Sequence, residues 1–221
     1  MKPNVFICGP SGTGKSSSLR NLNPETTCIL NTEQKALPFK GASKFKMNVP
    51  VADYKKASAK IDFDRAFNKA IVSDDIETIV VESFTSLTEM IFRECDLLFS
   101  GFEVWGEYNK RIDKVLHTSK STNKNIIFLG IDEFVENDGG VDERFVKVQG
   151  KAWKKSVEKE FVMVLFTDVN IDEKGLPSYR FITNKCEGHT QISAKSPMEM
   201  LPTYMENDLA EVIKLSTEYY N

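Results

Sequence analysis

A short run of residues near the start of the sequence has the types and spacing needed to hold phosphate. Residues 9–16 fit the pattern G-x-x-x-x-G-K-[ST] at every defined position. The glycines permit backbone angles that point main-chain amides into one loop. Lys15 can then reach the β and γ phosphates, and the Ser16 hydroxyl is a magnesium ligand. The predicted nucleoside triphosphate site consists of Gly9, Pro10, Ser11, Gly12, Thr13, Gly14, Lys15, Ser16 and Ser17.

A chance match is the alternative, and it is expected in about one chain of this length in a hundred. The run lies between residues 4–8, which are mainly apolar, and residues 15–22, which have a helical pattern. This order of strand, loop and helix is the context that phosphate binding requires. A dinucleotide site is disfavoured, because the third glycine of G-x-G-x-x-G is missing after Gly12 and Gly14.

Two carboxylates at the ends of predicted strands are candidates for the chemistry of hydrolysis. Glu82 follows apolar residues 79–81, where a carboxylate can hold the metal, although Asp is the usual residue there. Glu33 can polarise the attacking water, because strand ends beside the phosphate-binding strand point at the nucleotide. The alternatives are a solvated rim charge for Glu82 and ordinary loop polarity for Glu33. The candidate catalytic residues are Lys15, Glu33 and Glu82, and the candidate metal ligands are Ser16 and Glu82.

Alternating strands and helices are predicted to position these residues. Uninterrupted apolar strands suit a parallel sheet that is covered on both faces. We therefore predict one α/β domain over residues 1–221, with a mainly parallel sheet flanked by helices and a C-terminal antiparallel hairpin. The predicted strands are 4–8, 27–31, 76–81, 125–131 and a hairpin of 161–171 with 178–184; the helices are 15–22, 63–72, 85–99, 103–118 and 207–220; residues 36–51 are expected to be irregular.

Composition narrows the class of protein. The chain has 221 residues, 41% of them hydrophobic, and a net charge of −3, so binding to nucleic acid requires a local basic patch. The longest apolar run, 161–166, is too short to span a membrane, and the first apolar run ends at Cys8. We therefore expect no membrane partner, no signal peptide and a cytoplasmic protein. The scattered cysteines predict reduced core thiols rather than a zinc site.

The order of the motifs resembles the RecA-type ATPase core. That core has a P-loop, then a strand ending in [DN]-x-E, here Asn31-Thr32-Glu33, and then a strand ending in an acid and a serine, here Glu82-Ser83. In that family the glutamate of the second strand is the catalytic base, and the resemblance assigns this role to Glu33. It also implies a P-loop NTPase fold, with ATP and Mg²⁺ as cofactors.

More specific features are Trp105-Gly106, Gly150-Lys151 and Ala194-Lys195-Ser196-Pro197. Together they resemble the small phage-encoded AAA or RecA-like ATP-binding proteins, a group that includes single-strand DNA annealing proteins. The resemblance covers nearly the whole chain. It implies a role in phage recombination or replication, in the host cytoplasm. It also implies a homo-oligomer on single-stranded DNA, with a single-strand binding protein as a further partner.

The sequence departs from the RecA-type pattern at three positions. Asn31 and Glu82 stand where Asp is common, and Asp132 stands where a polar sensor, often His or Gln, is expected. The first two departures bear on the rate of hydrolysis more than on nucleotide binding. Asp132 leaves the sensing mechanism open.

A basic segment is the candidate DNA-binding surface. Residues 144–159 carry six basic residues and one acidic residue, a net charge of +5 within an acidic chain. Lysines contact phosphates, Trp153 can stack on a base, and residues 138–140 predict a mobile loop before the segment. In the alternative interpretation the charges form a solvated face and Trp153 anchors a helix in the core. The candidate contacts are Arg144, Lys147, Lys151, Trp153, Lys154 and Lys155.

RecA-type ATPases often complete the site with a basic residue from the next subunit. Lys185 and Lys195 lie beyond the predicted hairpin and are the candidates for stabilising transition-state charge in trans. Each can equally be an ordinary surface lysine.

These observations favour an ATP-hydrolysing protein that acts on single-stranded DNA. A small-molecule kinase is the second hypothesis, because such kinases open with the same motif. They need arginines around the phosphates, and those of this chain are isolated in sequence. A non-hydrolysing, nucleotide-dependent scaffold, in which Glu33 and Glu82 are structural, is the third hypothesis.

Overall fold

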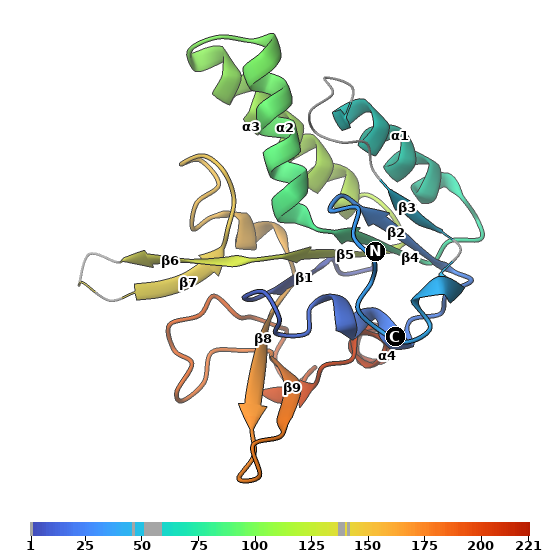
Figure 1. Cartoon of the computed structure of the whole chain (residues 1–221), viewed down its shortest axis with the longest axis vertical. Helices are drawn as coiled ribbons and strands as arrows, with labels where there is room; N and C mark the ends of the chain where they lie inside the picture. The colour runs from blue at the N-terminus through green and yellow to red at the C-terminus, as the bar shows by residue number, and fades with distance from the viewer. Residues whose placement is uncertain (1, 46, 51–58, 137–139, 141) are drawn as a thin grey trace.

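The computed structural model describes residues 2–45, 47–50, 59–136, 140 and 142–221 (Figure 1). Within these residues it has an eight-stranded sheet, in the order β10-β9-β8-β1-β5-β4-β2-β3, and a separate hairpin, β6-β7. Strands β8 to β3 along this order are parallel, whereas β9 and β10 are antiparallel to their neighbours. The predicted α/β architecture with a C-terminal antiparallel hairpin is therefore confirmed.

Most of the predicted elements are present, with small shifts at their ends. The strands are β1 Val5–Cys8, β2 Thr27–Asn31, β3 Asn48–Pro50, β4 Thr78–Glu82, β5 Asn125–Gly130, β6 Asp132–Glu136, β7 Asp142–Val146, β8 Met163–Ile171, β9 Pro177–Ile182 and β10 Tyr204–Glu206. The α-helices are α1 Ala59–Val72, α2 Phe84–Leu98, α3 Phe102–Lys120 and α4 Leu209–Tyr220, and the 3₁₀-helices are η1 Ser16–Asn21, η2 Ala42–Lys44 and η3 Val157–Glu160.

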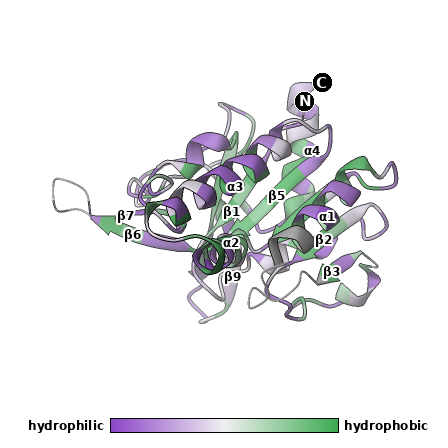
Figure 2. Ribbon diagram, turned by 90° about the horizontal axis from the view of Figure 1, so that it is seen from above, coloured by the Kyte–Doolittle hydropathy of each residue, from purple (hydrophilic) through white to green (hydrophobic). Residues whose placement is uncertain are grey.

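Two hydrophobic cores cover the two faces of the sheet, because successive side chains of a strand point to opposite faces. Phe6 and Cys8 of β1 join the core that contains residues of α1, α2 and α3. Val5 and Ile7 join the other core, with residues of η1 and α4. Figure 2 shows β1 and β5 as hydrophobic strands and hydrophilic residues along α3. Burial on both faces explains why these strands have no polar alternation.

The helix predicted at residues 15–22 is the short 3₁₀-helix η1. Ser18 Oγ donates to Lys15 O at 2.6 Å, and the Ser18 N–H is shared between Gly14 O and Lys15 O. Serine side chains that bond to nearby carbonyls compete with regular helix, and Pro24 prevents extension of the segment. The predicted helix is therefore present over Ser16–Asn21, as a 3₁₀-helix rather than an α-helix.

The hairpin of β6 and β7 was not predicted. It continues from β5 after Ile131 and projects away from the sheet (Figure 1). β6 has no buried residue, so its sequence lacks the apolar pattern of a core strand. Residues 138 and 139 of the predicted mobile loop lie outside the described residues. Within the part of the chain that the structure describes, no helix has both the length and the apolar composition needed to cross a membrane.

Candidate functional site

The predicted phosphate-binding loop follows β1 and is braced by β8. Gly14 has a φ of +95°, in the left-handed region that glycine adopts without strain. A Cβ at Gly9 would lie 2.0 Å from Thr167 Oγ1, so this position has no room for a side chain. Thr13 Oγ1 lies 2.5 Å from the same Thr167 atom, which ties the loop to β8. The backbone of the loop is therefore held in place before any ligand arrives.

Lys15 bends back into the loop. Its Nζ donates to Gly9 O and to Pro10 O, at 2.7 Å each. Burial lowers the pKa of Lys15, while nearby carboxylates, including Glu82, act to raise it. Two main-chain carbonyls thus hold the ammonium group at the position from which it can meet phosphate oxygens.

Ser16 and Glu82 meet at the ends of η1 and β4. Ser16 Oγ donates to Glu82 Oε1 at 2.7 Å, and the buried Glu82 Oε2 has no hydrogen-bond partner among the residues that the structure describes. Burial raises the pKa of Glu82 to about 7; the Ser16 hydrogen bond acts against this rise and the charge of Glu33 adds to it. A serine hydroxyl beside a carboxylate with a free oxygen is the kind of donor set that Mg²⁺ takes. The two predicted metal ligands therefore fit this ion.

Glu33 lies beside Glu82 because β2 and β4 are neighbouring parallel strands, with Asn31 paired to Glu82. Glu33 Oε1 accepts from Ser83 Oγ at 3.0 Å, and Glu33 Oε2 accepts from Lys35 Nζ at 2.9 Å. Burial acts to raise the pKa of Glu33, but the hydrogen bonds from Lys35 and Ser83 and the charge of Lys35 lower it overall. This carboxylate is therefore ionised and oriented.

One cavity of about 460 Å³ joins these groups. Eight of the predicted residues line it, whereas Gly9, Pro10 and Thr13 serve in the hydrogen bonds of the loop itself. The predicted lining residues are Ser11, Gly12, Gly14, Lys15, Ser16, Ser17, Glu33 and Glu82. The residues that sequence reasoning missed are Lys35, Pro38, Ser83, Gly130, Ile131 and Tyr179.

The predicted DNA-binding residues are only partly exposed. Trp153 is 8% exposed and packs in the core, which corrects its predicted role as a base-stacking residue. Arg144 Nε donates to Asp132 Oδ2 at 2.6 Å, so its charge is engaged within the protein. Lys154 lies 3.6 Å from Glu133, and Lys155 lies over the Phe145 ring. Of the basic residues, Lys151, Lys154 and Lys155 are exposed, whereas Lys147 is half-buried.

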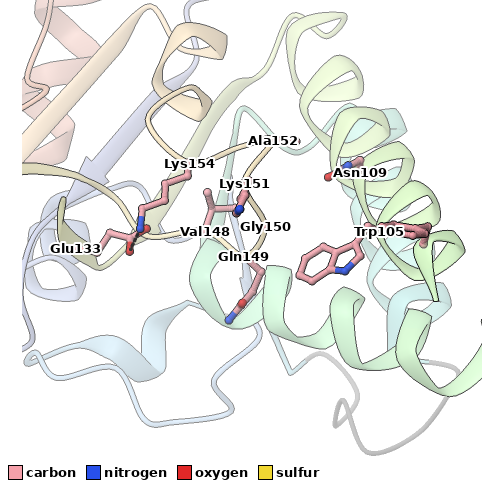
Figure 3. A pocket seen from close by; sticks show the side chains of 10 residues that line it. Trp105, Asn109, Glu133, Val148, Gln149, Gly150, Lys151, Ala152 and Lys154 are labelled. Atoms are coloured by element: carbon pink, nitrogen blue, oxygen red, sulfur yellow. Dashed lines mark ion pairs between the residues drawn. The ribbon is translucent and has the colours of Figure 1, made fainter. Parts of the chain in front are cut away.

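A second cavity, of about 690 Å³, lies between α3 and residues 148–154 (Figure 3). Trp105 and Asn109 of α3 face this segment, and Lys154 reaches toward Glu133. Phe102, which also lines the cavity, is 95% exposed. Sequence reasoning noted Trp105 only as a feature of the family resemblance and did not select Phe102, although the position of Phe102 at the start of a helix, outside its apolar stripe, was a readable signal.

The two candidates for action in trans differ in their surroundings. Lys185 is exposed in the segment after β9. Lys195 is half-buried and joined to Val164 of β8 by two main-chain hydrogen bonds. Burial lowers the pKa of Lys195, while the charges of Glu158 and Glu160 raise it. Lys195 thus has carboxylates of its own chain nearby.

Comparisons with known proteins identify the family of the domain. A family model described as an AAA domain matches residues 1–198. Among solved structures, a KaiC-like protein from the hyperthermophilic archaeon Pyrococcus horikoshii is similar, with 12% identity and a TM-score of 0.46 over 81% of this chain and 78% of that chain. No curated protein matches the sequence significantly.

The family match and the sheet topology together confirm the predicted fold class, a RecA-like P-loop NTPase fold with antiparallel C-terminal strands. The family implies nucleotide binding, typically with Mg²⁺. Because the matched residues include the phosphate-binding loop and both strand-end carboxylates, this chain belongs to the AAA domain family of P-loop ATPases.

Proposed function

We propose that this chain binds ATP with Mg²⁺, hydrolyses the ATP, and acts on single-stranded DNA. The observation that carries the catalytic part is the connected group of Lys15, Ser16, Glu82 and Glu33 around one cavity. The resemblance to small phage-encoded proteins supports a place in phage recombination or replication, with the protein assembled as a homo-oligomer on the DNA. A single-strand binding protein in the same cytoplasm is the further partner that this role requires.

Each side chain of the site has a task that follows from its position. Lys15 exchanges its loop carbonyls for phosphate oxygens and stabilises the charge that develops on the transferred phosphoryl group. Ser16 and Glu82 would hold Mg²⁺, which would neutralise phosphate charge. Glu33, held by Ser83, orients the attacking water and accepts its proton.

The cavity between α3 and residues 148–154 supports the DNA-binding part of the proposal. It combines two exposed aromatic side chains, Phe102 and Trp105, with the cations Lys151 and Lys154. Aromatic rings that stack on bases, beside cations that follow the phosphates, are the features by which proteins hold single strands without sequence preference. The stacking role that Trp153 cannot fill therefore passes to α3.

A short segment joins this cavity to the nucleotide cavity. Gly130 and Ile131 line the nucleotide cavity, and Glu133 lines the other and pairs with Lys154. Between them, Asp132 is fixed by Arg144 at 2.6 Å. A ligand that changes the position of this segment at one end changes it at the other, so DNA binding and ATP turnover are coupled in this proposal.

The test is the fate of the γ phosphate with and without single-stranded DNA. We expect free phosphate, stimulated by DNA, and a loss of about a hundredfold or more in Glu33→Gln, the range that a positioned base supplies. Glu173→Gln, at the exposed hairpin tip, is the matched control and should behave like the wild type. Phe102→Ala should keep its DNA-free rate and lose about tenfold in DNA affinity, whereas the exposed Met198→Ala should not.

Other outcomes separate the alternatives. Transfer of phosphate to a small acceptor would indicate a kinase, and neither release nor transfer would indicate a scaffold. If the rate of phosphate release is the same with and without DNA, the ATPase part of the proposal stands and the DNA-binding part is rejected. Full activity in Glu33→Gln would remove Glu33 as the base.

A further inference from the structure

Tyr179 faces the nucleotide cavity from β9. Its ring is 43% exposed and lines the cavity, and no other described residue of that lining is aromatic. A Cβ at Gly14 would lie 3.1 Å from Tyr179 Cδ1, so the ring edge contacts the phosphate-binding loop. An aromatic ring beside a triphosphate site offers a surface on which a nucleobase can stack.

Asn207 lies beside this ring with an unsatisfied amide group. Its side chain is 1% exposed, and neither Nδ2 nor Oδ1 has a hydrogen-bond partner among the described residues. Both atoms would lie 3.3 Å from a Cβ at Gly14, and the Asn207 N–H donates to Tyr179 O at 3.2 Å. Burying an amide without partners is costly, so such a group is rare unless a ligand or water completes it.

The sheet places Tyr179 and Asn207 across the loop from the catalytic acids. β9 and β8 lie on one side of β1, whereas β4 and β2, which carry Glu82 and Glu33, lie on the other side beyond β5. Arg20 of η1 fixes the backbone of Asn207. Its Nη1 donates to Asn207 O, and its Nη2 lies 3.0 Å from Glu206 Oε1. If the metal and the γ phosphate of a nucleotide lie near these acids, its base must lie on the opposite side of the loop, where Tyr179 is.

We propose that Tyr179 and Asn207 form the nucleobase subsite, with the Tyr179 ring stacked on the base and the Asn207 amide paired to its edge. The inference rests on the proposed function, because it requires a nucleoside triphosphate in the loop. The half-exposed ring turns onto the face of the base, and this movement opens the amide to the edge of the base. An asparagine amide donates and accepts at once, which matches N7 and N6 of adenine. The corresponding guanine edge offers two acceptors, so the subsite favours ATP over GTP.

The test compares three ligands, ATP, GTP and inorganic tripolyphosphate, by calorimetry with Mg²⁺. Tyr179→Ala should weaken ATP binding by about tenfold or more, the effect of one lost stacking contact, and should leave tripolyphosphate binding unchanged. Tyr179→Phe should keep the wild-type affinity, because the ring remains. Asn207→Asp should weaken ATP binding, because a carboxylate can accept from N6 of adenine but cannot donate to N7. Tyr219→Ala, on the exposed surface of α4, is the matched control.

The outcomes distinguish this inference from the function on which it rests. If Tyr179→Ala binds ATP like the wild type, or if the wild type binds tripolyphosphate as tightly as ATP, the subsite is overturned while the phosphate site stands. If the wild type binds none of the three ligands, the proposed function itself fails. Should Asn207→Asp not fold, the comparison of Tyr179→Ala with Tyr179→Phe decides the question alone.

Discussion

The two carboxylates of the site have opposite pKa shifts because their surroundings differ. Glu82 is buried and receives one hydrogen bond, from Ser16, so burial dominates and its pKa rises to about 7. Glu33 is less buried, and hydrogen bonds from Lys35 and Ser83 favour its charged form. Pairs of acids whose environments separate their pKa values are a common basis for different chemical roles. Here the ionised Glu33 can accept a proton, and a metal ion beside Glu82 would favour its ionised form.

Glu158 is a buried carboxylate outside the site, and it makes the stability of the protein depend on pH. Its Oε1 accepts from the Val146 N–H at 2.7 Å and from Ser193 Oγ at 3.2 Å, and its Oε2 has no hydrogen-bond partner in the described part of the chain. Burial raises the pKa of Glu158, although these hydrogen bonds and the charge of Lys195 act to lower it. The folded state therefore retains a proton that the unfolded chain has already released.

Stability from Glu158 is full below its ordinary pKa and is lost as the pH rises through the raised value. We expect Glu158→Gln, which has no charge to bury, to lose less stability than the wild type between pH 5 and pH 8. Thermal melts at both pH values measure this, and each kcal/mol appears as about 2–4 °C in Tm at this size. The exposed Glu218→Gln is the control and should follow the wild type. Parallel pH profiles of Glu158→Gln and the wild type would contradict the prediction.

The site residues that could be predicted from sequence are those whose function depends on local spacing. The loop from Gly9 to Ser16 is contiguous, and Glu33 and Glu82 were found because each follows an apolar strand. Tyr179 and Asn207 reach the loop only through the register of β8, β9 and β10, which local spacing does not encode. Trp153 was misplaced because a tryptophan among lysines has the same local pattern in a core as on a surface.

At the scale of elements, the packing of α3 against residues 148–154 depends on Gly150. Gly150 has a φ of +84°, and a Cβ there would lie 3.0 Å from Cζ3 of Trp105. The absence of a side chain lets the Trp105 ring pack on the backbone of this segment. The segment then forms the second wall of the cavity that we propose for DNA.

We therefore expect Gly150→Ala to displace Trp105 and weaken single-stranded DNA binding severalfold. Gly175→Ala is the matched control, because Gly175 has a similar φ of +77° but nothing within 4 Å of a Cβ. Both variants should lose about 1–2 kcal/mol of stability from the left-handed backbone, but only Gly150→Ala should lose DNA affinity. Fluorescence anisotropy with a labelled oligonucleotide measures the affinity. Equal affinities in the two variants would show that the Trp105 contact does not shape the DNA surface.

The helices and strands were predictable where burial imposes a regular pattern of apolar residues on the sequence. The central strands and the amphipathic helices α1 to α4 bury large apolar faces, and each was found within a few residues. The hairpin of β6 and β7 was missed because its partly exposed strands carry charged residues such as Glu133 and Arg144. η1 was predicted as a helix of residues 15–22, and it forms a slightly shorter 3₁₀-helix in which the Ser18 side chain bonds to Lys15 O.

At the scale of the whole molecule, the strand order distributes the parts of one site over most of the chain. β1 and its loop lie near the centre, the acids of β2 and β4 lie on one side, and β9 lies on the other. This arrangement leaves the exposed segment after β9, which carries Lys185, outside its own nucleotide cavity. In a homo-oligomer with head-to-tail contacts, such a segment can meet the cavity of the next subunit.

Mixing two inactive variants tests this arrangement. Lys15→Ala lacks its own phosphate site but can supply Lys185 to a neighbour, and Lys185→Ala has the reverse defect. If Lys185 acts in trans, each variant alone hydrolyses ATP poorly with DNA, and an equal mixture recovers activity in about a quarter of its sites, those with the productive pair of neighbours. Lys195→Ala should remain active alone, because Lys195 lies beside Glu158 and Glu160 of its own chain. Full activity of Lys185→Ala alone, or a mixture that stays inactive, would show that this lysine does not complete the site.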